Sequence, residues 1–283
     1  MKKFLSLLMA MAMVACLFAA CGETETTPET ETTVDEATET VTFTMGTNAE
    51  FAPFEYVENN EIVGYDIDMA QEIAKDMGAE LVIENMDFDG LVTAVSTGKI
   101  DAAIAGMSVT EERKESVDFS KPYYTAAQVI IVNADSETVA TAADLEGKVV
   151  AVQEGTTGDI YVTENCNAAE VSRYKKAVNA LMDLESGKVD AVVLDEEPAK
   201  NYSAQFAGLV ILDEALTAEE YAIAVAKGNA DLLDAINATI DRMTEEGKFD
   251  ELKEKYGLNA PAEEAEEVVA EEVVEEAAET EAE

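Results

Sequence analysis

The chain has 283 residues, of which 61 are acidic and 18 are basic, and it contains no histidine. The formal net charge of −43 excludes nucleic-acid-binding proteins, because a phosphate backbone requires clustered lysines and arginines. The lack of histidine excludes Ser-His and Cys-His nucleophiles and histidine-ligated zinc sites.

Residues 1–21 have the pattern of a targeting segment and are set apart from the fold. Two lysines precede an apolar run from Phe4 to Phe18, which is too short for a permanent membrane-spanning helix. Small residues then lead to Cys21, an order that resembles the lipobox of bacterial lipoproteins, in which the cysteine is lipidated and becomes the new N-terminus. The alternative is an ordinary cleaved secretory signal. Either interpretation predicts export, and the first predicts a lipid anchor at the extracytoplasmic face of the cell membrane.

Two acidic segments flank the part of the chain that can fold. Residues 22–40 consist almost entirely of Thr, Glu, Asp, Pro and Ala, which predicts a disordered tether. Residues 260–283 repeat Glu and Val pairs without a basic residue, which predicts a solvated, disordered tail. Between them, Cys166 is the only cysteine, so we expect no intramolecular disulfide.

The hydrophobic pattern of the central part alternates between strand and helix. Val41, Phe43 and Met45 alternate with threonines, which predicts a strand that ends at Gly46. The pattern then predicts a helix over 66–77, a strand from Leu81, a helix over 89–97 and an apolar strand over 100–105. This order indicates a mostly parallel sheet covered by helices.

A short sequence then recurs 89 residues later, since VSTGKIDA at 95–102 is echoed by LESGKVDA at 184–191. Each copy has a helix end, a Gly-Lys stop and the start of a buried strand, which predicts two similar α/β lobes. A chance match between short connections is the alternative. Further strands are predicted over 149–153, 189–194, 210–212 and 221–225, and further helices over 232–243 and 248–256.

The predicted fold class is therefore α/β with two lobes, each a mostly parallel sheet covered by helices. The first lobe comprises residues 41–122 and 224–259, and the second lobe comprises residues 128–218. A chain that leaves the first lobe and returns needs two connections, which we place at 123–127 and 219–223.

Three segments of this part resemble the polar amino-acid-binding proteins of ABC importers. They are TNAEFAPFEY at 47–56, GYDIDM at 64–69 and GMSVTEERKESVDFSKPYY at 106–124, and the similarity extends over 41–258. The resemblance implies the periplasmic-binding-protein fold, with two hinge strands between the lobes. It also implies a monomer that binds a free L-amino acid, polar or basic, and delivers it to a membrane permease, without catalysis, cofactor or metal.

Ligands of open parallel sheets bind beyond the carboxyl ends of the strands. There the resemblance assigns the ligand's α-carboxylate to Arg113, whose planar guanidinium suits a carboxylate, and to Ser108 five residues earlier. Thr157 is assigned the same carboxylate, at a predicted helix start that favours anions. Asp195 and the carbonyl of Gly106 are assigned the ammonium group. Without the resemblance, Arg113 would be interpreted as a surface residue of the charged sequence EERKE.

The ligand side chain is assigned to aromatic and amide residues. Phe51, Phe54 and Phe88 resemble the aromatic residues that sandwich it, although core packing explains Phe54 equally well. Asn48 and Gln153 occupy positions that vary with the ligand among members of the family, and neither is charged here.

Two other functions fit the same fold. An enzyme of the cyclohexadienyl dehydratase type would need a carboxylic acid with a raised pKa in the cleft, for which Glu50 and Asp195 are available. A surface sensor or adhesin would bind ligand without transport. An amino acid recovered unchanged would argue against the enzyme, and a permease gene beside this one would argue against the sensor.

Overall fold

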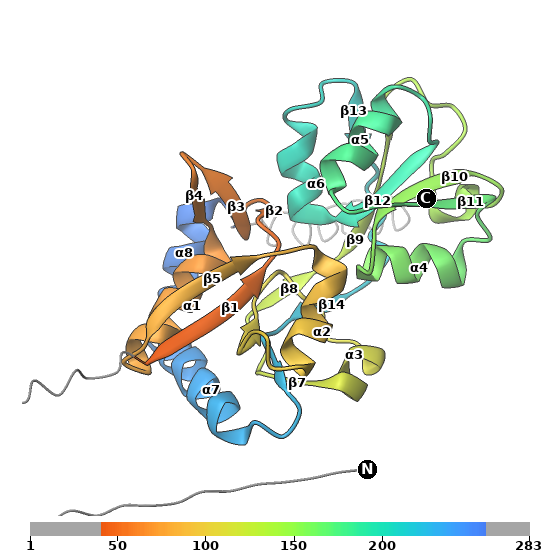
Figure 1. Cartoon of the computed structure of the whole chain (residues 1–283). Helices are drawn as coiled ribbons and strands as arrows, with labels where there is room; N and C mark the ends of the chain where they lie inside the picture. The colour runs from red at the N-terminus through yellow and green to blue at the C-terminus, as the bar shows by residue number, and fades with distance from the viewer. Residues whose placement is uncertain (1–40, 259–283) are drawn as a thin grey trace, which may run out of the picture. The chain divides into compact units, whose positions relative to one another are not determined.

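The computed structural model describes residues 41–258, and the structural statements that follow refer to this part of the chain (Figure 1). The predictions made for residues 1–40 and 259–283, including lipidation of Cys21, lie outside the described residues. None of the helices between residues 41 and 258 has both the length and the apolar character that a membrane crossing requires.

The first five-stranded sheet has the strand order β5-β1-β6-β15-β7. Its strands are β1 Thr42–Thr47, β5 Glu80–Asn85, β6 Ala102–Ala103, β7 Val117–Phe119 and β15 Ala224–Ala226. β1 pairs in parallel with β5 and β6, whereas β15 is antiparallel to both β6 and β7. Four of the five strands therefore run in one direction, and β15 alone is reversed.

The second five-stranded sheet repeats this plan in the order β11-β10-β12-β9-β13. Its strands are β9 Gln128–Asn133, β10 Val149–Gln153, β11 Glu170–Tyr174, β12 Ala191–Asp195 and β13 Leu209–Ile211. β10 is parallel to β11 and β12, and β9 alone is reversed. The predicted fold class, with two mostly parallel sheets, is confirmed. We call each sheet with its helices the first and the second lobe.

The echoed segments occupy the same place in both sheets. In the first lobe the backbone N–H of Thr44 on β1 donates to Asp101 Oδ2 at 2.7 Å, just before β6. In the second lobe the N–H of Val149 on β10 donates to Asp190 Oδ2 at 2.8 Å, just before β12. A glycine with a φ of 70° ends the preceding helix in each copy. The two Asp-Ala pairs therefore occupy equivalent positions in the two sheets.

Helices cover the sheets on both faces. In the first lobe they are α1 Tyr65–Asp76, α2 Leu91–Ser96, α3 Glu111–Ser116, α7 Ala230–Glu245 and α8 Lys248–Tyr256. In the second lobe they are α4 Thr157–Asn165, α5 Ala177–Glu185 and α6 Glu196–Ser203, and 3₁₀ turns span Phe88–Gly90 and Ala142–Leu145. The neighbours Ala102 and Ala103 on β6 pack into different hydrophobic clusters, because successive strand side chains point to opposite faces.

Two strand predictions near the centre of the first sheet had wrong bounds. β1 does not end at Gly46 but continues to Thr47. Gly46 packs closely there, since a Cβ at this position would lie 2.3 Å from Cδ1 of Ile100, whose side chain would have to move. The predicted strand over 100–105 forms ladder pairs only at Ala102–Ala103, although its apolar residues are buried.

The predicted strand over 221–225 is two short strands with different partners. β14 Glu219–Tyr221 pairs antiparallel with β8 Tyr124–Ala126, and the chain then enters the first sheet as β15. Figure 1 shows β8 and β14 beside each other. Both strands fall inside the segments predicted as connections, whereas the lobe boundaries themselves stay a prediction.

A small antiparallel sheet near the start of the first lobe was not predicted. It consists of β2 Glu50–Phe51, β3 Glu55–Glu58 and β4 Glu61–Val63. Its first two strands carry Phe51 and Glu55, which are both buried. This sheet therefore supplies one wall of the site described next.

Candidate functional site

A buried cavity lies at the carboxyl ends of parallel strands from both sheets. Asn48 follows β1, Gln153 ends β10 and Asp195 ends β12. The cavity is nearly closed, because its lining side chains leave a free volume of only about 10 Å³. Its walls hold every residue predicted to bind the ligand except Phe54, together with three residues that were not predicted. The lining residues are Asn48, Phe51, Glu55, Phe88, Ala105, Gly106, Ser108, Arg113, Gln153, Thr156, Thr157 and Asp195.

Arg113 points into this cavity and is only 7% exposed. Helix α3 places it there, because the N-cap Thr110 accepts a hydrogen bond from the Arg113 backbone N–H at 3.1 Å. Its guanidinium donates to the carbonyl of Ser108 at 2.6 Å and to that of Gly155, in the second lobe, at 2.9 Å. A guanidinium has five N–H donors, so three remain for a ligand. Burial lowers the Arg113 pKa, but from a value so high that the group stays charged.

Thr157 begins helix α4 beside the same cavity. The N-cap Thr156 accepts from the backbone N–H of Asp159 at 3.3 Å. The Thr157 hydroxyl accepts from Gln128 Nε2 at 3.1 Å and donates to Glu219 Oε2 at 2.7 Å. Because its one proton is already committed, the backbone N–H groups at the helix start are the donors left for an anion.

Asp195 lies on the second-lobe wall and is 4% exposed. A buried acid without a partner would be costly. Asp195 has a partner, because the hydroxyl of Tyr221 donates to Asp195 Oδ1. Burial, and next the negative charge of Glu219, raise the pKa of Asp195 to about 7. Asp195 can therefore remain buried without a ligand by holding a proton part of the time.

Glu219, on β14, was not predicted as a site residue. Its Oε2 accepts from the hydroxyl of Thr157 at 2.7 Å and from that of Ser108, while its Oε1 accepts from Thr217 at 2.7 Å. One carboxylate thus joins a first-lobe hydroxyl to a second-lobe hydroxyl. The only sequence signal for it was its position inside a predicted connection.

Asn48 and Gln153 meet across the cavity as an uncharged amide pair. Gln153 Nε2 donates to Asn48 Oδ1 at 2.9 Å, and Asn48 Nδ2 donates to the carbonyl of Met86 at 2.9 Å. They are 5% and 3% exposed, respectively. Phe51 and Phe88 line the same space, and the Arg113 guanidinium carbon lies 5.3 Å from the centre of the Phe88 ring.

Known proteins resemble this chain over most of its length. A probable histidine-binding protein of Campylobacter jejuni is 34% identical over 260 residues, which are 91% of this chain and all of that protein. The sequence pattern of the bacterial extracellular solute-binding proteins, family 3, matches residues 43–259. The chain belongs to this family.

Solved structures resemble this family 3 binding protein in fold as well as in sequence. The holo form of ArgBP from T. maritima is 46% identical, with a TM-score of 0.69, over 76% of this chain and 95% of that one. An ancestral arginine-binding protein is 42% identical, with a TM-score of 0.73, over 76% of this chain and 97% of that one. That ancestral protein was solved both with arginine and with glutamine.

Phe54 of the family 3 binding protein is not part of the cavity wall. Its side chain is fully buried, and its ring packs edge-on against those of Tyr124 at 4.9 Å and Tyr221 at 5.2 Å. The packing of Phe54 therefore favours the core-packing alternative over contact with a ligand. Phe54 belongs to an aromatic cluster with Tyr124 of β8 and Tyr221 of β14, and its ring packs against that of Tyr221.

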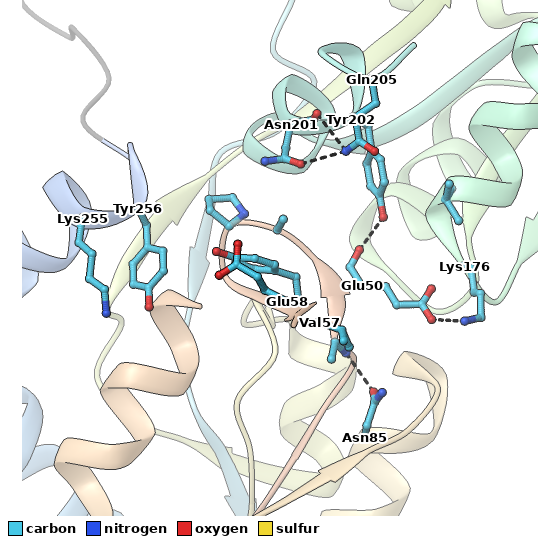
Figure 2. A pocket seen from close by; sticks show the side chains of 15 residues that line it. Glu50, Val57, Glu58, Asn85, Lys176, Asn201, Tyr202, Gln205, Lys255 and Tyr256 are labelled. Carbon is cyan, nitrogen blue, oxygen red and sulfur yellow. Dashed lines mark hydrogen bonds and ion pairs between the residues drawn. The ribbon is translucent and has the colours of Figure 1, made fainter. Parts of the chain in front are cut away.

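Glu50 points into a separate, open groove at the outer edge of the lobes (Figure 2). There its carboxylate pairs with Lys176, and its backbone carbonyl accepts from the hydroxyl of Tyr202 at 2.6 Å. Lys176 and Tyr202 belong to the second lobe, so Glu50 helps to hold the lobes together. Because it is not among the residues that line the buried cavity, it is not placed to protonate a ligand there.

The cavity of the family 3 binding protein has the chemistry of a zwitterion site. A guanidinium and a helix start lie on its walls with buried carboxyl groups, and aromatic rings and amides lie between them. Within residues 41–258, no group of three or more Cys, Asp or Glu side chains is placed to hold a metal ion. The arrangement can orient a small molecule that carries a carboxylate and an ammonium group.

Proposed function

We propose that this family 3 binding protein, as a monomer, holds one free polar or basic L-amino acid between its lobes and delivers it to the permease of an ABC importer. The observation that carries the proposal is the position of Arg113 and Asp195 on the walls of one buried cavity. A guanidinium forms paired hydrogen bonds with a carboxylate, and a carboxylate accepts from an ammonium group. Together they match the two charged groups that all free amino acids share.

The amide pair of Asn48 and Gln153 determines the proposed preference for the side chain. An amide both donates and accepts hydrogen bonds, so the pair fits side chains with N–H groups. Relatives are named for arginine and histidine, and the ancestral relative was solved with arginine and with glutamine. We therefore expect arginine, histidine or glutamine to bind. Aspartate and glutamate are disfavoured, because the cavity wall already holds the carboxyl groups of Glu55 and Asp195.

A thermal-shift screen of the common amino acids, followed by calorimetry, tests the proposal. We expect one ligand per chain and a raised melting temperature, because a ligand that binds only the folded state stabilises it. Binding of acidic amino acids alone would contradict the preference, and no binding at all would contradict the function. The bound amino acid should be recovered chemically unchanged, whereas conversion to a product would favour the dehydratase-like alternative.

We also propose that Cys21 carries the lipid that keeps the exported protein at the membrane. The support is the sequence around Cys21 and the export expected of an extracellular solute-binding protein. A Cys21→Ser variant should appear in the soluble extracytoplasmic fraction, and the control Cys16→Ser, five residues earlier in the sequence, should stay with the membrane. Retention of the Cys21→Ser variant at the membrane would contradict the anchor.

A further inference from the structure

Three buried carboxyl groups lie together at the base of the cavity. Glu55 and Asp66 have no exposed surface, and Asp195 is 4% exposed. Glu55 and Asp195 line the cavity, whereas Asp66 lies behind Gly106, whose N–H donates to Asp66 Oδ2 at 2.8 Å. Arg113 is the only basic residue among those that line the cavity. The cluster therefore holds more acidic groups than positive charges.

The hydrogen bonds of these groups are unevenly distributed. Asp66 Oδ2 accepts a second bond from the hydroxyl of Tyr123 at 2.8 Å, and Asp195 accepts from Tyr221. By contrast, no protein N–H or O–H group donates to either carboxyl oxygen of Glu55, or to Asp66 Oδ1. A buried carboxylate without a donor is costly, so Glu55 is not expected to be ionised in this arrangement.

A proton between Glu55 and Asp66 supplies the hydrogen-bond donor that these carboxyl oxygens lack. A protonated Glu55 can donate to Asp66 Oδ1, which satisfies an oxygen of each group. The electrostatics agree, because burial first, and then the charge of Asp66, raise the pKa of Glu55 well above its ordinary value. Burial likewise raises the pKa of Asp66 to about 6. This arrangement favours at least one proton on the Glu55–Asp66 carboxyl pair near neutral pH.

We propose that Glu55 and Asp195 together form the ammonium site, and that binding of an amino acid releases a proton from these two carboxyl groups. This inference rests on the proposed function. The ligand enters with its ammonium group intact, and the proton passes from a carboxyl group to the solvent. The carboxylate left behind takes the ammonium group as its hydrogen-bond donor. The ammonium charge compensates the carboxylate from which the proton left, and the ligand's own carboxylate is compensated by Arg113, so the cavity is not left with an additional uncompensated charge.

Other charged and titratable groups surround Glu55 and Asp195 from every neighbouring element. They are Asp66 on α1, Arg113 on α3, Tyr123 before β8, and Glu219 and Tyr221 on β14. Burial raises the pKa of Tyr221 well above its ordinary value, so this phenol stays neutral. Arg113 also keeps its charge, because even a lowered guanidinium pKa lies far above neutrality. The exchangeable protons near pH 7 are thus those of the carboxyl groups.

Release of a proton determines the direction in which the binding affinity changes with pH. When binding releases protons, the affinity rises with pH, by up to about tenfold per pH unit for one proton. We expect this rise between roughly pH 6 and pH 7.5, around the pKa of about 7 that burial gives Asp195. A ligand that bound only to carboxylates already ionised would show no such slope.

Calorimetry in buffers of different ionisation enthalpy measures the exchange directly. For the wild-type protein at pH 7, the binding enthalpy should vary linearly with the buffer's ionisation enthalpy, with a slope of roughly 0.5 to 1 proton released per ligand. Glu55→Gln keeps the shape of the side chain but removes one of the two exchanging carboxyl groups, so the slope should become smaller. Glu58→Gln is the matched control, because Glu58 is exposed at the other end of β3.

Each outcome decides between the two hypotheses. Wild-type binding without a buffer-dependent heat, or an unchanged slope in Glu55→Gln, would overturn the inference and leave the proposed function intact. No binding of any amino acid would overturn the proposed function instead. If Glu55→Gln does not fold, infrared spectra of the wild type at pH 7 give the answer. The band of an un-ionised carboxyl group should weaken when ligand is added, and a band that is absent or unchanged would refute the exchange.

Discussion

Arg113 carries the only positive charge among the residues that line the cavity, and acidic groups surround it. The charges of Glu219 and Asp195 act to raise its pKa against the lowering effect of burial. Its position over the Phe88 ring and its two carbonyl bonds fix the plane of the guanidinium. The residue therefore supplies both the charge and the orientation that a ligand carboxylate requires.

Replacing Arg113 tests this role at the level of a single side chain. In Arg113→Met, a ligand carboxylate would be buried without its partner, which typically costs about 2 to 5 kcal/mol. Calorimetry should therefore show a loss of affinity of at least about thirtyfold. Lys114→Met, on the exposed side of the same helix, is the control and should bind normally. Unchanged affinity in Arg113→Met would refute the assignment of the carboxylate.

The residues that sequence reasoning located differ in kind from those it missed. Arg113, Thr157 and Asp195 could be placed because the family resemblance assigns them, and each lies in a segment that follows a predicted strand. Glu55 and Glu219 could not, because glutamate is normally solvated and no local pattern marks one as buried. Glu55 even lies within the segment 47–56 that carried the family resemblance. Its importance depends on Asp66 and Asp195, which only the folded chain brings beside it.

Among the elements, the short strand β14 lies where the chain crosses between the lobes, and its residues contact the site. Its first residue, Glu219, accepts from hydroxyls of both lobes, and its last residue, Tyr221, donates to Asp195. One short strand therefore contacts groups predicted for both ends of the ligand. A change in the position of β14 would alter the carboxylate and the ammonium site together.

We expect Glu219→Ala to loosen the ligand-free protein. The variant loses the hydrogen bonds that join Ser108 to Thr157, and bonds to a charged acceptor typically contribute about 1.5 to 3 kcal/mol each. Small-angle X-ray scattering of the ligand-free variant should give a larger radius of gyration than the wild type. Glu220→Ala, at the exposed neighbouring position, should leave the radius unchanged. Equal radii for Glu219→Ala and the wild type would contradict the bridge.

Amphipathic elements were predictable, whereas strands buried on both faces were predicted only in part. The helix over 248–256 and the strand over 149–153 were predicted with the bounds that the structure shows. β9 was missed, because QVIIVN has no alternation that would separate a buried strand from a buried helix. The segment 221–225 was predicted as one strand, because its sequence does not show that the hydrogen-bond partner changes within it.

At the scale of the whole molecule, the echo between 95–102 and 184–191 predicted two lobes of similar design. The shared strand order of the two sheets confirms that design. Ligands of open parallel sheets bind beyond the carboxyl ends of the strands, and this rule predicted which edge of each sheet faces the other. How closely the lobes approach without a ligand could not be predicted, since it depends on bonds such as that from Gln153 to Asn48.

The buried acids make the stability of the ligand-free protein depend on pH in an unusual direction. A carboxyl group whose pKa is raised by folding stabilises at low pH, and this contribution is lost as the pH rises through the raised value. With values of about 6 for Asp66 and about 7 for Asp195, the melting temperature should fall between pH 5 and pH 8. By contrast, the hydrogen bond from Arg242 lowers the pKa of Glu72, so Glu72 titrates at a more acidic pH than these buried acids.

Differential scanning calorimetry of the ligand-free protein at several pH values tests this dependence. The Asp195→Asn variant has one titrating group fewer, so its melting temperature should fall less steeply from pH 5 to pH 8. A saturating ligand should flatten the wild-type curve as well, because its ammonium group compensates the ionised acids. A wild-type melting temperature that rises with pH would contradict the assignment, as would parallel curves for the wild type and the variant.

The position of β15 has a consequence for the order in which the nascent chain can fold. In the first sheet β7 is paired only with β15, and the ribosome makes β15 after all strands of the second sheet. The second sheet lies within one continuous stretch, 128–211, so it can be completed first. Although proteins generally fold from the N-terminus during synthesis, here the later-made sheet should become protease-resistant on stalled chains before the earlier one.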